Sequence, residues 1–260
     1  MLYAKEYIGS IGVGVTVPQL IRADDDKVYV VKLKNNRLGM KVLVNEFIAS
    51  RLGTIGELCF PASDVITLSE EFIKSSKKLK RLKAMAGLHF ATYYLRSSKY
   101  VHHYHLRAVR NKTQFAGVML FDHLFHNADR TLNGKNMLVR REIDGYHMYA
   151  IDNSHLIGSG RWTKENLVIM IDGVKLNKRR AYGTLLRHYL KESDFTAYVE
   201  KFLAISEEQI KEIVDDIPEE WLSDIETREE LQKFLLARCA MAEEVAAMLT
   251  ALIPNENGST

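Results

Sequence analysis

The sequence predicts an α+β protein of two lobes, a β-rich N-terminal lobe and a mainly helical C-terminal lobe. Residues 1–60 alternate short β-forming runs with one helical run, and two more β-forming runs lie at residues 65–68 and 88–95. Residues 160–260 show helical spacing of apolar residues almost throughout. We therefore place the N-terminal lobe at residues 1–97 and the C-terminal lobe at residues 98–260.

Composition is that of an ordinary globular protein. The chain has 260 residues, of which 47% are hydrophobic and 27% are charged. A formal net charge of +3 is too small to indicate nucleic-acid binding. The two cysteines, Cys59 and Cys239, lack the spacing of a metal site or a disulfide framework. Neither a signal peptide nor a transmembrane run is visible, so we expect a cytoplasmic protein with no membrane span.

Charge is unevenly distributed along the chain. Lysine and arginine crowd residues 74–83, and acidic residues crowd 207–230. The basic run suggests either an anionic surface as partner or a solvated helix, and the second is the more common meaning. The acidic run is typical of the outer face of surface helices.

The most informative stretch is residues 126–139, which an apolar helical run precedes and a β-hairpin around Asp144 follows. The hairpin returns to Asp152. Phosphoryl transfer needs one carboxylate near the acceptor hydroxyl, with an amide and a second carboxylate on the metal. We assign Asp129 as the catalytic base, and Asn136 and Asp152 as the magnesium ligands. Singly, each could be a turn or capping residue, but their order is unusual for chance.

Upstream residues complete a nucleotide site. A glycine-rich turn between strands lets backbone amides approach phosphate oxygens, although alone it is weak evidence. A strand then carries Lys32, and the helix predicted at residues 41–52, with Gly53 as its stop, carries Glu46. In a kinase-type site the lysine grips phosphates and the glutamate orients the lysine. The expected ATP-binding residues are Lys32, Glu46, Gly9, Ser10, Gly12 and Gly14.

Three further segments allow more than one interpretation. The strand at residues 88–95 reads as an edge strand that leads into an interlobe hinge against which adenine would lie. His102 and His105 could bind a metal, but a polar or stacking surface is favoured because no carboxylate or thiol completes the site. Asp122 and His123 could brace the following loop or lie on a helix surface.

The C-terminal region predicts packed helices. Ser206 with Gln209, and Thr227 with Glu230, have the spacing of capping boxes. The second box would open a long helix that Pro254 stops.

Taken together, these motifs resemble those of the HipA-like kinase family. The resemblance covers about the first 160 residues and is carried by Tyr29-Val30-Val31-Lys32, Asn45-Glu46, Arg51-Leu52-Gly53, Phe121-Asp122-His123, Asn127-Ala128-Asp129-Arg130 and Ala150-Ile151-Asp152-Asn153. It implies a bilobal protein-kinase-like fold, with Mg²⁺ and ATP as cofactors and a protein Ser or Thr hydroxyl as acceptor. It gives Lys32, Glu46, Asp129, Asn136 and Asp152 the roles assigned above.

Two alternatives remain open. Six residues separate Asp129 from Asn136, where kinase-like loops usually have four, and Asn133 comes too early. That spacing suggests, as one alternative, a pseudokinase that binds nucleotide but does not transfer phosphate. A lipid or small-molecule kinase is also consistent with the Asp129-Arg130 pair and with the basic run at 74–83.

Overall fold

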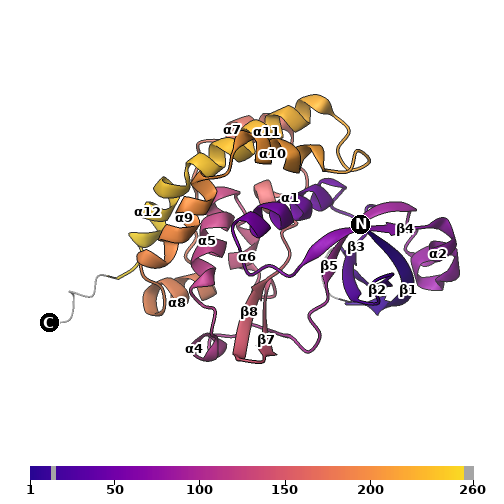
Figure 1. Cartoon of the computed structure of the whole chain (residues 1–260), viewed down its shortest axis with the longest axis horizontal. Helices are drawn as coiled ribbons and strands as arrows, with labels where there is room; N and C mark the ends of the chain where they lie inside the picture. The colour runs from indigo at the N-terminus through magenta and orange to yellow at the C-terminus, as the bar shows by residue number, and fades with distance from the viewer. Residues whose placement is uncertain (13–15, 255–260) are drawn as a thin grey trace.

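The computed structural model describes residues 1–12 and 16–254, and it divides into a strand-rich lobe and a helical lobe (Figure 1). The first lobe contains β1 (Leu2–Ser10), β2 (Gln19–Ala23), β3 (Val28–Lys32), α1 (Lys41–Ile55), β4 (Ser63–Leu68), α2 (Glu70–Ser75), α3 (Lys77–Arg81) and β5 (Gly87–Tyr93). The second begins with β6 (Lys99–Tyr100), α4 (His105–Ala108), α5 (Gln114–Leu124), α6 (Asp129–Leu132), β7 (Met137–Glu142), β8 (Gly145–Ala150) and the 3₁₀ turn η1 (Leu156–Gly158). It ends with α7 (Lys164–Ile169), α8 (Arg180–His188), α9 (Ser193–Leu203), α10 (Glu207–Asp215), α11 (Ile225–Ala240) and α12 (Ala242–Thr250). The predicted α+β bilobal fold is confirmed.

The N-terminal strands close into a barrel of order β1-β2-β3-β5-β4. Neighbours are antiparallel except β1 and β4, which close the barrel as a parallel pair at Leu2 and Ile66. The inward-facing side chains of Ile21, Val31 and Ala91 are fully buried and belong to one hydrophobic cluster. β5 bonds to β3 on one side and to β4 on the other. The expectation of an edge strand was therefore wrong, because barrel closure leaves β5 no open edge.

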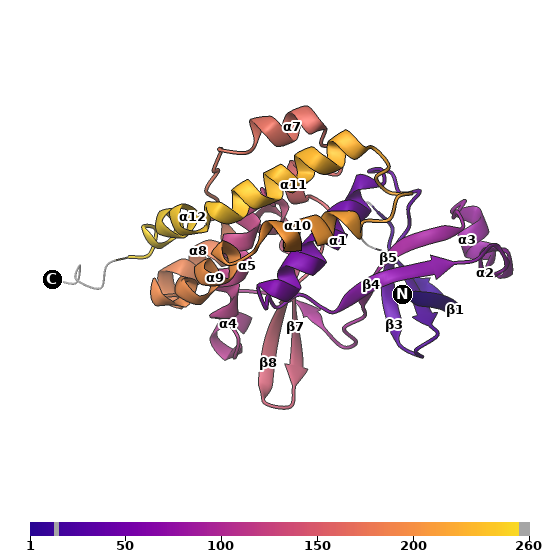
Figure 2. The same ribbon diagram turned by 45° about the horizontal axis from the view of Figure 1, so that its top comes forward.

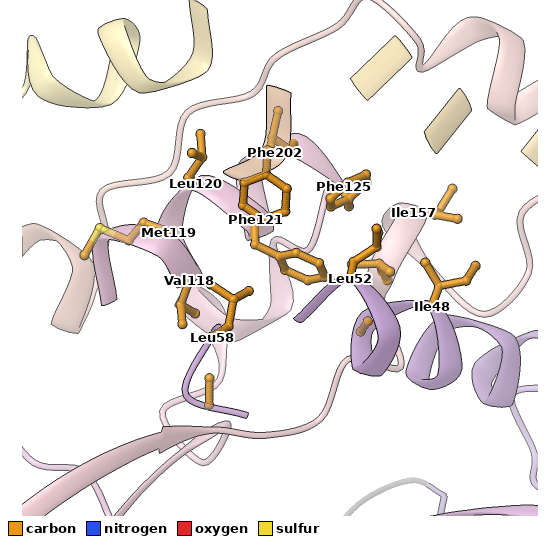
Figure 3. Close-up of a cluster of buried hydrophobic side chains, with 14 of the residues drawn as sticks. Ile48, Leu52, Leu58, Val118, Met119, Leu120, Phe121, Phe125, Ile157 and Phe202 are labelled. Atoms are coloured by element: carbon orange, nitrogen blue, oxygen red, sulfur yellow. The ribbon is translucent and has the colours of Figure 1, made fainter. Parts of the chain in front are cut away.

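Helix α1 connects the two lobes. Ten of its 15 residues are buried, and they lie on all sides of the helix instead of on one stripe. Figure 3 shows Ile48 and Leu52 of α1 facing Phe121 of α5 and Phe125, which directly follows α5. The large core that contains α1 continues through the C-terminal helices. The boundary expected between residues 97 and 98 stays a prediction, because hydrophobic packing runs across it.

Helix α1 does not stop at Gly53, as the sequence suggested, but continues to Ile55. The glycine has a packing role instead. A β-carbon at this position would lie 2.5 Å from Cδ2 of Phe60, whose ring packs edge-on against Phe121 at 5.3 Å between centroids. Gly53 therefore lets the chain that follows α1 lie against the helix.

Two helix starts in the C-terminal lobe test the capping predictions. Ser206 and Gln209 form the expected capping box at the start of α10. The second box was wrong, because α11 begins three residues earlier, with the Asp224 carboxylate accepting from the backbone N–H of Thr227. An Asp at the N-cap accepts hydrogen bonds from free backbone N–H groups of the first turn, as a Ser or Thr does. The long terminal helix is also interrupted at Met241, which separates α11 from α12.

The basic run at 74–83 forms parts of α2 and α3, whose lysines are exposed. Helix α2 lies at the outer end of the barrel, far from α6 (Figure 1), and α3 lies beside α2 (Figure 2). In the described part of the chain, no helix combines the length and apolar character needed to cross a membrane.

Helix α5 delivers the loop at residues 125–136, and its packing depends on Gly117. A β-carbon there would lie 2.3 Å from Cδ1 of Tyr198 on α9. We expect Gly117→Ala to lower the free energy of unfolding, because overpacking costs about 1–3 kcal/mol and exceeds the roughly 1 kcal/mol that alanine adds in a helix. Urea denaturation measures this change. Gly173→Ala, which meets no atom within 4 Å, is the control, and a Gly117→Ala protein more stable than wild type would contradict the prediction.

Candidate active site

A cavity of about 320 Å³ lies between the barrel and the helical lobe. The N-terminal lobe contributes residues of β3 and of the segment that leaves β5, and the C-terminal lobe contributes residues around β7 and β8. Its lining includes Ile11, Pro18, Val30, Lys32, Glu46, Pro61, Thr92, Tyr93, Tyr94, Leu95, Ser98, Lys99, Tyr100, Asn133, Lys135, Asn136, Leu138, Ile151 and Asp152. Aliphatic side chains line it beside charged ones, as in many small-molecule sites.

Three charged side chains from distant parts of the sequence meet in this cavity. Lys32 is the last residue of β3, Glu46 lies on α1, and Asp152 follows β8. The Lys32 ammonium donates to Glu46 and to Asp152, the latter at 2.6 Å between Nζ and Oδ1. Asp152 has a φ of +60°, which a non-glycine residue rarely adopts. The Oγ of Ser154 donates to the same Oδ1 at 2.6 Å.

Burial and charge act in opposite directions on these groups. Burial opposes the charged form of Lys32, but the carboxylates of Asp152 and Glu46 outweigh it and raise the pKa of Lys32 above its usual value. Burial also opposes ionisation of Asp152, yet the charge and hydrogen bond of Lys32 hold the pKa of Asp152 well below its usual value. Burial raises the pKa of Glu46, and Lys32 opposes that rise. The charge of Lys32 thus stabilises the ionised forms of the buried Glu46 carboxyl and of the half-buried Asp152 carboxyl.

Asp129 and Asn136 face one another across the loop that joins α6 to β7. The Nδ2 of Asn136 donates to Oδ2 of Asp129 at 2.6 Å. Its backbone carbonyl accepts from Ile151, which places it next to Asp152. Asn133 also lines the cavity, but its side chain accepts from the backbone N–H of Lys135. The extra loop residues are therefore accommodated in the short helix α6 and a turn, where the backbone N–H of Asn133 donates to the backbone carbonyl of Asp129. Asn136 is the asparagine whose side chain contacts the Asp129 carboxylate.

The glycine-rich loop is placed only in part. Ile11 and Pro18 of this connection line the cavity, whereas the described residues Gly9, Ser10 and Gly12 do not. Gly12 has a φ of +72°, a conformation that favours glycine, and its N–H donates to Oγ of Ser10. Gly14, also expected in the nucleotide site, lies outside the described residues.

Arg130 was not assigned a role from the sequence, although it lies next to Asp129. Its side chain is fully buried and forms an ion pair with Asp122 at 2.8 Å. It also donates to the carbonyl oxygens of Asn136 and Ile151, and to the side chain of Asn153. The hydroxyl of Tyr182 donates to Asp122 as well. Asp122 therefore braces the loop, as one of the two interpretations of the sequence held.

Asn45 precedes Glu46 on α1 and holds the segment after Asp152. Its fully buried amide nitrogen donates to the carbonyl oxygens of Ser154 and Leu156, both at 2.8 Å, and lies 3.1 Å from that of Ser159. Its Oδ1 accepts from the indole N–H of Trp162 at 2.8 Å. The sequence signals only that Asn45 neighbours a predicted site residue, since its partners lie more than 100 positions away.

Two other polar residues were missed. Ser154 bonds to Asp152, and Nδ1 of His155 lies 3.7 Å from Oδ2 of Asp129. Both directly follow the Asp152-Asn153 pair, which was the available signal. His102 and His105 instead form an aromatic surface group in which His102 stacks on Tyr104 at 5.5 Å between centroids. Among residues 1–12 and 16–254, no three His, Cys, Asp or Glu side chains gather as metal ligands.

The oxygen atoms of Asn136 and Asp152 fit a magnesium ion. Asn136 uses its Nδ2 for Asp129, and Asp152 uses Oδ1 for Lys32 and Ser154. Oδ1 of Asn136 and Oδ2 of Asp152 therefore remain as ligand atoms, and the hydrogen bonds just described hold both side chains in place. Mg²⁺ is commonly held by one or two protein oxygens and completed by phosphate oxygens and water.

A comparison with known protein families shows to which family the chain belongs. A family model described as HipA-like kinase matches residues 4–156, which is more than half of the chain. The chain belongs to the HipA-like kinase family. The match contains Lys32, Glu46, Asp129, Asn136 and Asp152, and it supports a phosphotransferase activity. No curated protein matches the chain in sequence.

Solved structures share the fold of this HipA-like chain. A Helicobacter pylori proinflammatory kinase, CtkA, is 14% identical with a TM-score of 0.58, and the match covers 98% of this chain and 97% of that one. A Golgi casein kinase with Mn and ADP bound is 11% identical with a TM-score of 0.54, covering 99% of this chain and 74% of that one. A second structure of the Golgi casein kinase has a TM-score of 0.54 at 11% identity, covering 96% and 73%. At such identities the likeness concerns the fold.

The contacts of Asn45 predict a graded loss of stability. Asn45→Ala leaves buried carbonyl oxygens and the Trp162 indole unpaired, so we expect the free energy of unfolding to fall by about 3 kcal/mol. Trp162→Phe removes the indole N–H together with part of the buried ring, and its loss should be smaller because it breaks only one of the hydrogen bonds of Asn45. Chemical denaturation of both variants checks the order, and equal losses would contradict the central position of Asn45.

The Lys32 cluster predicts a change in pH dependence. Because the folded pKa of Lys32 is raised above 10.5, its stabilising charge is fully present between pH 5 and 8. The lowered pKa of Asp152 places its stabilising contribution above about pH 3.8, to be lost as pH falls further. In Lys32→Met both carboxyl groups lose their counter-charge and their pKa values rise, so ionising them at higher pH costs stability.

We therefore expect the destabilisation by Lys32→Met, relative to wild type, to be larger at pH 8 than at pH 5. Urea denaturation across this range gives the difference. Lys27→Met, which removes an exposed lysine paired with Asp25, serves as the control and should show a small difference with little pH dependence. A Lys32→Met effect that is constant with pH would contradict the coupling.

Proposed function

We propose that the chain is an ATP- and Mg²⁺-dependent kinase that phosphorylates Ser or Thr hydroxyl groups of a protein. The observation that carries the proposal is one cavity lined by the Lys32–Glu46–Asp152 cluster and by Asn136, whose side-chain amide donates to Asp129. Phosphoryl transfer depends mainly on positioning and charge neutralisation, and these groups supply both.

The nucleotide would lie with its base against the segment that leaves β5. Tyr94 and Leu95 line the cavity there, and Val30 and Leu138 provide apolar lining. Lys32 would bind the phosphates, with Glu46 holding its ammonium in place. A solved structure of the same fold carries Mn and ADP, which is consistent with nucleotide and divalent metal use by this chain.

Asn136 and Asp152 would hold the metal through their remaining oxygens. Mg-ATP supplies the phosphoryl group, and its metal neutralises charge on the phosphates. Asp129, held by Asn136, would accept the proton of the acceptor hydroxyl as that oxygen bonds to the γ-phosphorus. The bond from phosphorus to the bridging oxygen breaks and ADP leaves. The resulting products are ADP and a phosphorylated Ser or Thr.

A protein acceptor is favoured over a lipid. Two of the solved structures of this fold are kinases described as proinflammatory kinase and casein kinase. The basic helices α2 and α3, which suggested a membrane surface, lie at the end of the barrel remote from α6, where Asp129 begins its helix (Figure 1). An anionic membrane on those helices would not reach Asp129.

Asp129→Asn tests the assignment of the base. Because general-base catalysis contributes about 10²–10⁴-fold, we expect transfer from γ-labelled ATP to acceptor protein in a cell extract to fall by at least 100-fold, with ATP binding retained. Asp144→Asn, in the exposed turn between β7 and β8, should transfer at the wild-type rate. The label in extract proteins measures transfer, and isothermal calorimetry measures ATP binding.

Different outcomes would separate the alternatives. Transfer retained by Asp129→Asn would remove this residue as the base. ATP binding without any transfer by the wild type would favour a nucleotide-binding scaffold, and the absence of ATP binding would overturn the proposal.

A further inference from the structure

A second segment of the C-terminal lobe lies directly beside the loop that carries Asp129. The backbone N–H of Asn177 donates to Nε2 of the buried His123 at 3.0 Å. The side chain of Asn177 donates to Oγ1 of Thr131, two positions after Asp129. These two bonds fix an irregular stretch, residues 174–179, against the loop and lead it into α8.

The fixed stretch carries four basic side chains, Lys175, Lys178, Arg179 and Arg180, which we call the basic strip. All four are exposed. Within residues 1–12 and 16–254 none of them forms an ion pair, in contrast to Arg130, which is buried and paired with Asp122. A set of exposed cations without acidic partners, held in place by its neighbours, presents a positive surface.

The basic strip extends along both sides of Asn177. At one end Lys175 lines a cavity of about 250 Å³ together with Asn127, Ala128 and Thr131 of the Asp129 loop. At the other end, Nη1 of Arg180 lies 3.5 Å from the position that a β-carbon on Gly134 would occupy. The strip therefore lies along the loop that carries Asp129, next to which the acceptor hydroxyl would bind.

We propose that the basic strip binds acidic side chains that flank the acceptor Ser or Thr in the protein substrate. This inference rests on the proposed function and adds the class of substrate. Six residues of extended chain span about 20 Å, so a peptide that follows residues 175–180 would bring two or three carboxylates within reach of the strip. The carboxylates would find cations that have no competing partners, which favours recognition by charge complementarity.

The 250 Å³ cavity favours a peptide over a membrane. Its lining combines the polar groups of His126, Thr131 and Asn177 with the apolar side chain of Met170. A hollow beside the strip suits one side chain of a bound segment, while a lipid surface would need a flat or convex cationic face. Anionic vesicles are therefore the competing probe in the test.

Binding to an inert acidic peptide tests the inference without requiring transfer. The probe is a fluorescent ten-residue glutamate peptide, and its Kd is measured by anisotropy at 50 and 150 mM salt. The test variant replaces all four strip residues, K175Q, K178Q, R179Q and R180Q. The matched control replaces four exposed cations of α3, K77Q, K78Q, K80Q and R81Q, which changes the net charge equally.

We expect the test variant to bind the peptide about tenfold more weakly, since each exposed ion pair contributes about 0.2–1 kcal/mol. The α3 variant should bind as wild type does. A triple variant that keeps Arg180, the first residue of α8, should show an intermediate loss and guards against misfolding of the fourfold variant. Equal weakening by both fourfold variants, or no binding by wild type, would overturn the inference.

Two further arms separate the remaining outcomes. Sedimentation with anionic phospholipid vesicles that depends on the strip, in the absence of peptide binding, would overturn the inference in favour of a membrane surface. In transfer assays with Ser peptides, phosphorylation without any preference for flanking Glu would overturn the inference while the kinase function stands. Strip-dependent peptide binding without transfer would instead support the basic strip as a site for acidic peptides and count against the proposed function.

Discussion

The buried ion pair between Arg130 and Asp122 is the interaction on which the candidate site depends. Both side chains are almost completely removed from solvent, and the pair is surrounded by partners from the hairpin, from Asn153 and from Tyr182. Removing one member of such a pair leaves an uncompensated buried charge, which costs about 3–5 kcal/mol. Because Arg130 directly follows Asp129, the pair also fixes where the proposed base lies.

Helix α1 is the second constraint, since consecutive residues on it serve the two halves of the site. Glu46 binds Lys32 of the barrel, and Asn45 binds the segment after Asp152 in the helical lobe. The same helix is buried on all sides in the core that it shares with α5. The barrel lysine and the C-terminal aspartate are thus brought together by the packing of one helix, and movement of α1 would separate them.

Much of the fold could be predicted because its signals are local. The helical spacing of α5, the turn at Asp144-Gly145 and the capping box at Ser206 each depend on residues within a few positions of one another. Predictions failed where packing overrode a local signal. Gly53 has the sequence signal of a helix end, but the helix continues past it and its missing side chain leaves room for the ring of Phe60. Asp224, and not Thr227, is the N-cap of α11. β5 has the composition of an edge strand, yet barrel closure pairs it on both sides.

The sequence by itself determined the candidates Lys32, Glu46, Asp129 and Asp152, because their order and their neighbouring strands, helix and hairpin are encoded locally. Only the tertiary structure decided that the side chain of Asn136, and not that of Asn133, contacts the Asp129 carboxylate, and that Arg130 and Asn45 hold the segments on either side of Asp152 in place. It also decided that the basic strip lies beside Asp129. The contacts of Asn45 join residues that lie more than 100 positions apart, and contacts at such separations are set by which buried polar groups can satisfy one another inside a shared core.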